Sequence, residues 1–138
     1  MNIYAEEVGH YWKTSKRSPD QWIDMARKQI EEVGGEVLAE GYGSDNKGHA
    51  AFMLGFAFGE ERFKLVWPVL ESYSGEDLAA RRQAATMIYH DVKAKAMTAK
   101  VLGFKTAFFS YVILPSGQTA AEASTPELVD AFPKLISG

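Results

Sequence analysis

Cysteine is absent from the 138 residues. Its absence excludes disulfide bonds, thiolate metal sites and cysteine nucleophiles, and it fits a reducing compartment. No apolar run reaches the length of about 18 residues that a membrane span needs. Residues 1–7 lack the basic start and apolar core of a secretion signal. We therefore expect a cytoplasmic protein with no membrane partner.

An excess of positive charge is also missing. The chain has 15 lysines and arginines against 18 aspartates and glutamates, so its net charge is −3. Binding to a polyanion would therefore have to come from a local patch and not from overall charge. The length fits one domain, residues 1–138. We divide it into an N-terminal segment (1–17), a core (18–103) and a C-terminal extension (104–138).

Recognisable catalytic machinery is the third absence. The histidines His10, His49 and His90 do not have metal-ligand spacing. Glu6 and His10 could share a helix face, but single surface residues of these types are common. The sequence has no phosphate loop, dinucleotide fingerprint or nucleophile elbow. We expect no catalytic residue, metal site or cofactor, although a small enzyme whose site is assembled from distant residues stays an alternative.

A first helix is predicted over residues 19–33. Ser18 can cap it, Pro19 suits its first position and Gln21 completes a capping box. Apolar residues from Trp22 onward recur at helical spacing, and the glycine pair 34–35 ends the helix.

Three antiparallel strands are predicted over residues 36–42, 49–58 and 62–67, because apolar side chains alternate with a period of two. Pairing should end at Pro68, which has no N–H to donate. A helix on one face of this meander gives an α+β fold that buries the phenylalanine face. The other face is light and partly basic, and is either open to a ligand or covered by the termini or a second subunit. It would carry Ala51, Met53, Gly55, Ala57, Arg62 and Lys64.

A long helix is predicted over residues 76–102. Ser74 can cap it, and Gly103 ends it. Its inward stripe would be Leu78, Ala85, Ile88, Val92, Ala96, Ala99 and Leu102. Residues 105–114 fit a helix or a strand, and a short helix is predicted over 126–132, so short elements pack beside the core.

A line of basic residues follows the predicted outer side of the long helix. At 100° per residue, Arg82, Tyr89, Lys93 and Lys100 lie within about 20° of one line, with Arg81, Lys95 and Lys105 nearby. Asp91 is the only acidic residue between 81 and 105. Such a surface could contact a phosphate backbone, or it is the solvated side of an amphipathic helix. The exposed aromatic candidates Tyr4, Trp12 and Tyr42 could stack on bases.

The segment Arg81-Arg82-Gln83-Ala84-Ala85-Thr86-Met87-Ile88-Tyr89-His90-Asp91-Val92-Lys93-Ala94-Lys95, with the turn Leu114-Pro115-Ser116-Gly117-Gln118-Thr119, resembles small phage and prophage proteins. Those proteins have a long helix with an arginine-rich start, and then a Leu-Pro-Asp-Gly-Arg-Thr turn. In this chain Ser116 and Gln118 replace the aspartate and arginine of that turn.

The order of elements resembles that of the double-stranded-RNA-binding domain and, more loosely, the core of phage single-strand annealing proteins. In the former, basic residues at the start of the last helix contact phosphates, and Arg81, Arg82 and Lys93 are the nearest counterparts. The usual lysine cluster is replaced by Glu76 and Asp77.

Three hypotheses follow. The first is a sequence-nonspecific DNA- or RNA-binding protein without enzymatic activity, with contacts from Arg81, Arg82, Tyr89, Lys93 and Lys100 and a second patch at Arg62 and Lys64. The second is a module that binds a host protein or associates with itself into an oligomer, suggested by the light sheet face and the apolar run 107–114. The third is the small enzyme mentioned above.

Overall fold

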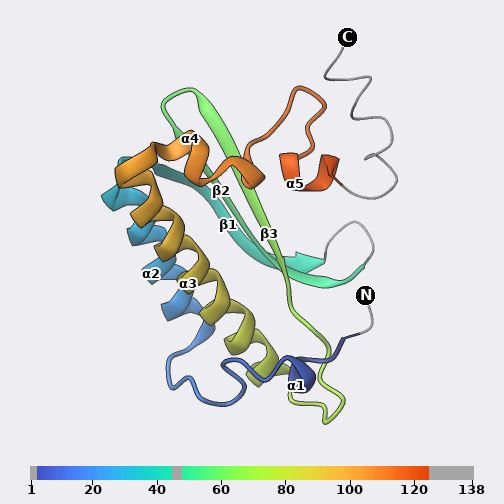
Figure 1. Cartoon of the computed structure of the whole chain (residues 1–138). Coiled ribbons are helices and arrows are strands. Elements are labelled where there is room, and N and C mark those ends of the chain that lie inside the picture. Colours follow the sequence, from blue (N-terminus) through green and yellow to red (C-terminus); the bar gives the residue numbers. More distant parts are fainter. Residues whose placement is uncertain (1–2, 45–47, 125–138) are drawn as a thin grey trace.

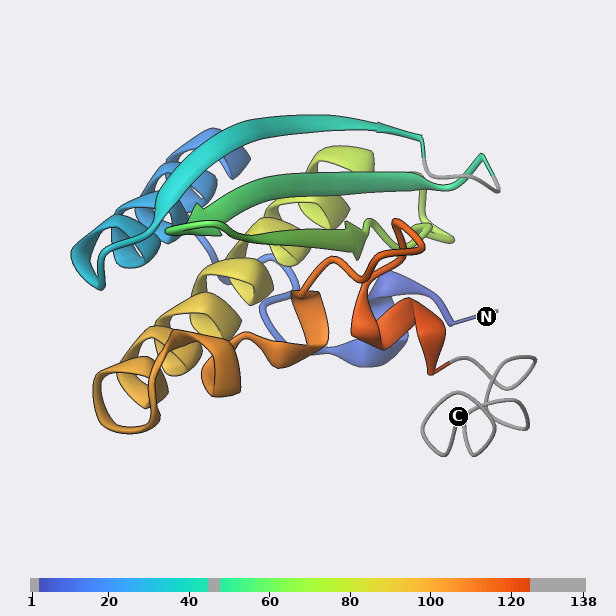
Figure 2. The ribbon, with the colours of Figure 1, turned by 90° about the horizontal axis from the view of Figure 1, so that it is seen from above.

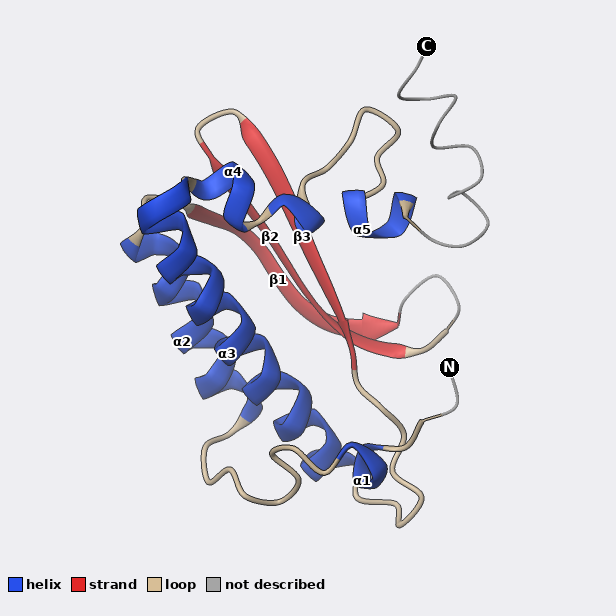
Figure 3. Cartoon of the chain, in the orientation of Figure 1, coloured by secondary structure: helices blue, strands red, loops and turns tan. Residues whose placement is uncertain are grey.

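The computed structural model describes residues 3–44 and 48–124. Helices and one antiparallel sheet form the α+β fold that the sequence predicts (Figure 1, Figure 3). In chain order the elements are α1 (Ala5–Val8), α2 (Pro19–Glu32), β1 (Glu36–Ser44), β2 (Ala50–Phe58), β3 (Glu61–Pro68), α3 (Asp77–Leu102), α4 (Phe104–Ala107), the 3₁₀ helix η1 (Phe109–Tyr111) and α5 (Ala120–Ala123).

The sheet is a meander with the strand order β1-β2-β3. A bulge interrupts β1 between Val37 and Ala39. The prediction that pairing ends at Pro68 is confirmed, because β3 ends at Pro68, whose pairing with Ala51 is the last of the ladder. The next amide, of Val69, donates to the Ala50 carbonyl (2.9 Å). Pro68 therefore occupies a position whose nitrogen points away from β2, where no N–H is needed.

Helices α2 and α3 lie side by side on one face of the sheet (Figure 1, Figure 2). The phenylalanine face of β2 and β3 packs against them, as predicted. Phe56 stacks on Phe63, and Phe108 from the C-terminal extension meets both rings; all three side chains are buried. This aromatic cluster joins the C-terminal extension to the helix-covered face of the sheet.

The caps of the two long helices differ from each other. Ser18 caps α2 as predicted: its Oγ accepts from the Gln21 amide (3.2 Å), and the Gln21 side chain accepts from the Ser18 amide (2.9 Å). The predicted cap at Ser74 is wrong. The Ser74 hydroxyl donates to the carboxylates of Glu6 and Glu76 instead, because Glu6, from the distant N-terminus, lies beside it.

The buried stripe of α3 is confirmed in its centre and wrong at its ends. Ile88, Val92 and Ala96 are buried, but Leu78 and Leu102 are 46% and 61% exposed. The helix is longer than the layer that it covers, so its terminal turns extend beyond the core.

The C-terminal extension follows the free edge of β3. Residues 105–114 are neither one helix nor one strand: α4 and η1 are followed by Val112, which bridges to Phe63, and the Ile113 amide donates to the Arg62 carbonyl (2.9 Å). Helix α5 was not predicted, although Thr119 and Glu122 form a capping box. The helix predicted over 126–132 lies outside the described residues.

Candidate nucleic-acid interface

The N-terminal strap, residues 3–17, crosses the outer side of the first half of α3 (Figure 1). The buried Gln83 side chain donates to the carbonyls of Ala5 (2.9 Å) and His10 (3.1 Å). The Tyr11 ring stacks on His90 with the centroids 4.9 Å apart. Because Gln83 satisfies two backbone acceptors in the strap, the strap is part of the folded core and not a tail.

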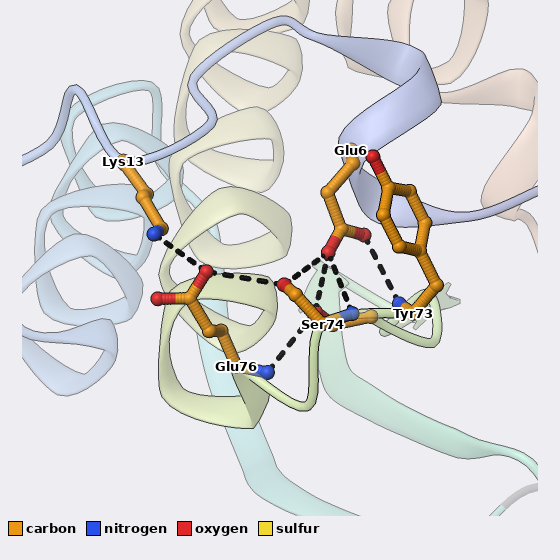
Figure 4. A network of polar contacts seen from close by, with 6 residues as sticks. Glu6, Lys13, Tyr73, Ser74 and Glu76 are labelled. Carbon is orange, nitrogen blue, oxygen red and sulfur yellow. Dashed lines mark hydrogen bonds and ion pairs between the residues drawn. The ribbon is translucent and has the colours of Figure 1, made fainter.

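A polar network anchors the other side of the strap to the loop before α3 (Figure 4). The Glu6 carboxylate accepts from the hydroxyls of Ser72 and Ser74, both at 2.6 Å, and from the amides of Tyr73 and Ser74. Lys13 reaches Glu76 at 2.5 Å. Partial burial raises the pKa of Glu6, but hydrogen bonds from Ser72, Ser74 and the backbone outweigh it and lower this pKa to about 2.

The two arginines at the start of α3 have neighbours of their own. The Arg81 guanidinium lies 5.5 Å from the centroid of the Tyr42 ring, in a cleft of about 680 Å³ that Glu71 and Asp77 also line. Arg82 lines a second cleft of about 650 Å³ beneath the strap, and its Nε is buried without a hydrogen-bond partner. This end of α3 therefore combines cations with carboxylates and is not a uniformly basic surface.

The middle of α3 is different, because aromatic and cationic groups alternate there beside α2. Trp22 of α2 meets Tyr89 with their centroids 5.3 Å apart. Arg17 lies 5.5 Å from the Trp22 centroid, and Lys93 lies 5.8 Å from the Tyr89 centroid. Lys100 follows Lys93 two turns further along the helix. We call this surface the α2–α3 seam and define it by Arg17, Trp22, Tyr89, His90, Lys93 and Lys100.

The cations of the seam differ from two neighbouring lysines in having no carboxylate partner among the described residues. Lys95 pairs with Asp91 (2.8 Å) on another side of α3, and Lys105 pairs with Glu61 (3.1 Å). Within residues 3–44 and 48–124, the three seam cations have no carboxylate partner; these are Arg17, Lys93 and Lys100. The seam is therefore positive and exposed, and it carries aromatic rings.

The Asp91 carboxylate has two interaction partners. Besides Lys95, it accepts a hydrogen bond from the Tyr111 hydroxyl (2.5 Å). Burial raises the pKa of Tyr111 well above its usual range, and the bond to Asp91 raises it further. Asp91, the acidic residue closest in sequence to Lys93, is thus bonded to Lys95 and to the C-terminal extension. It therefore does not pair with Lys93.

The predicted second patch lies elsewhere. Arg62 and Lys64 alternate in β3 with the buried Phe63 and Leu65, which face the helices. They therefore point to the opposite face of the sheet, where Lys64 approaches Glu122 at 4.0 Å. The structure brings Tyr89, Lys93 and Lys100 together, but it does not join them with Arg62 and Lys64.

Sequence reasoning did not place two residues of the seam in the predicted interface: Arg17, at the end of the strap, and Trp22, in α2. A helical projection could have placed Trp22 beside a neighbouring helix, but only packing shows that this helix presents Tyr89. In the part of the chain that the structure describes, no group of three or more His, Cys, Asp or Glu residues is arranged to hold a metal ion.

Comparisons with protein-family models, with curated proteins and with solved structures give no match to this chain. No helix among the described residues is long and apolar enough to cross a bilayer.

Proposed function

We propose that the protein binds nucleic acid without sequence specificity through the α2–α3 seam. The observation that carries the proposal is the group of three uncompensated cations, Arg17, Lys93 and Lys100, beside the half-buried rings of Trp22 and Tyr89. Cations that follow a backbone and rings on which bases stack are the two components of nonspecific single-strand binding.

The chemistry favours a single strand over a duplex. A base has to be unpaired to stack on Trp22 or Tyr89. The duplex-type contact would come from the start of α3, where Arg81 and Arg82 lie beside Glu71, Glu76 and Asp77.

Two variants with the same change in charge test the proposal. The first carries Arg17→Gln, Lys93→Gln and Lys100→Gln. The control carries Lys13→Gln, Lys28→Gln and Lys105→Gln, which removes three cations that pair with Glu76, Asp24 and Glu61. Both lose three positive charges, so the variants differ in the position and pairing of the removed cations and not in net charge.

Binding is measured by fluorescence anisotropy of labelled single- and double-stranded DNA and RNA at several salt concentrations. The seam variant should lose about tenfold or more in affinity at low salt. Its salt slope on single strands should become shallower by about 2, which is three contacts at about 0.7 each. Equal losses in both variants, or no binding by the unaltered chain at low salt, would refute the proposal.

Tryptophan fluorescence tests the stacking component separately. A base that stacks on Trp22 should quench its emission, and Trp22→Phe should remove this quenching while Trp12 and Trp67 remain as internal references. Quenching that is unchanged in Trp22→Phe would show that bases do not reach the seam.

A further inference from the structure

The open face of the sheet, which points away from α2 and α3, has an apolar centre. Met53 and Val66 lie opposite each other on this face and are 42% and 41% exposed. The residues beside them are small, so the surface is flat; they are Ala39, Gly41 and Gly55. Exposed large apolar side chains on a flat surface are typical of a face that another protein covers.

Opposite charges lie at the two edges of this face in one row. The register places Glu36 of β1 and Arg62 of β3 on either side of Ala57 in β2. Both side chains are exposed, and neither forms an ion pair with another described residue. The face is therefore acidic at its β1 edge and basic at its β3 edge.

We infer that a second copy of this chain packs on the open face, with a two-fold axis along β2. This axis places β1 of each chain over β3 of its partner, so Glu36 faces the partner's Arg62 and the reverse pair forms at the same time. Met53, on the central strand, then meets the partner's Met53. Two sheets in this aligned arrangement pack about 10 Å apart, as in other sandwiches, and the interface is isologous.

Pairing of strand edges does not offer the same fit. The β3 edge is already occupied, because Val112 bridges to Phe63 and the Ile113 amide donates to Arg62. The β1 edge is interrupted by the bulge between Val37 and Ala39, a feature that disfavours addition of a strand. The face is thus the better surface for self-association.

This inference does not rest on nucleic-acid binding. The seam lies on the helices that cover the other face of the sheet (Figure 2), so both seams of the dimer stay exposed. A failure of dimerisation and a failure of oligonucleotide binding are therefore separate results.

Sedimentation velocity and light scattering of the full chain over a range of concentrations test the inference. We expect a dimer, which Met53→Lys should weaken more than about 30-fold, because it places a lysine at the centre of the interface. Glu36→Arg and Arg62→Glu should each weaken it about tenfold, because each sets like charges against each other. The double variant, Glu36→Arg with Arg62→Glu, should restore it.

Val101→Lys is the matched control, since Val101 is an 81% exposed apolar residue on α3. It should leave the dimer unchanged. Circular dichroism and thermal unfolding of each variant separate loss of association from loss of fold. A strict monomer at all concentrations, a Met53→Lys variant that is folded and still dimeric, or a double variant no better than either single one would overturn the inference.

Discussion

The two halves of α3 both carry cations, but they meet different neighbours. In the first half, Gln83 is bonded to the strap, and Arg81 and Arg82 lie in clefts that also contain carboxylates. In the second half, Lys93 and Lys100 are exposed and uncompensated. The helical period alone predicts which face of α3 each residue occupies. Whether that face is exposed to solvent depends on which distant segment of the chain packs against it.

The strap is the cause of this difference. The strap packs against the side of α3 that carries Gln83, because the Gln83 side-chain amide donates hydrogen bonds to two strap carbonyls. After Tyr11, which stacks on His90, the strap turns towards α2. The strap therefore does not cover the outer side of α3 in the turns that follow His90. The path of the strap over the first half of α3 therefore both anchors the strap and leaves the α2–α3 seam exposed.

The largest effect should follow the loss of the contact that holds the strap. Gln83→Ala leaves the carbonyls of Ala5 and His10 without this donor and opens space beneath the strap. We expect the free energy of unfolding to fall by about 2–4 kcal/mol, measured by urea denaturation. Thr98→Ala, on the exposed side of α3, is the control and should change it by about 0.5 kcal/mol or less. An equal change in both variants would mean that the strap contributes little to stability.

A smaller effect should separate the two halves in binding. Lys93→Ala should weaken oligonucleotide binding several-fold and make its salt slope shallower by about 0.7 on single strands. Arg82→Ala should change affinity less than about twofold, because Arg82 lies beneath the strap beside Glu76 and Asp77. Anisotropy titrations on the same oligonucleotide compare them. A larger loss for Arg82→Ala would move the interface to the start of the helix.

The smallest effect should come from the acid response of the strap. The pKa of Glu6 falls from 4.5 to about 2 on folding, so the unfolded chain binds this proton more tightly. The stability that Glu6 contributes is thus present above pH 4.5 and is lost as the pH falls towards about 2. Glu6→Gln should make the pH dependence of the urea midpoint shallower in this window only. An unchanged acid profile would show that the network of Figure 4 does not hold in solution.

Much of the fold could be predicted because the signals are local. The capping box at Ser18, the period of two in the strands and the glycine after each long helix depend on near neighbours in the sequence. Ser74 shows where such signals fail: its position suits a cap, but a carboxylate 68 residues away binds it instead. Residues 105–114 were ambiguous because short apolar segments fit several structures until the edge of β3 selects one.

The sequence by itself determined the order of α2, the three strands and α3, the phenylalanine face of the sheet, and the alignment of Tyr89, Lys93 and Lys100 along one helix, because backbone geometry fixes these from local spacing. Only the tertiary structure decided that Arg17 and Trp22 join that line and that Arg62 and Lys64 leave it. The reason is that packing brings distant segments together and decides which charges are buried or paired. The local periodicity of the sequence contains no information about these contacts.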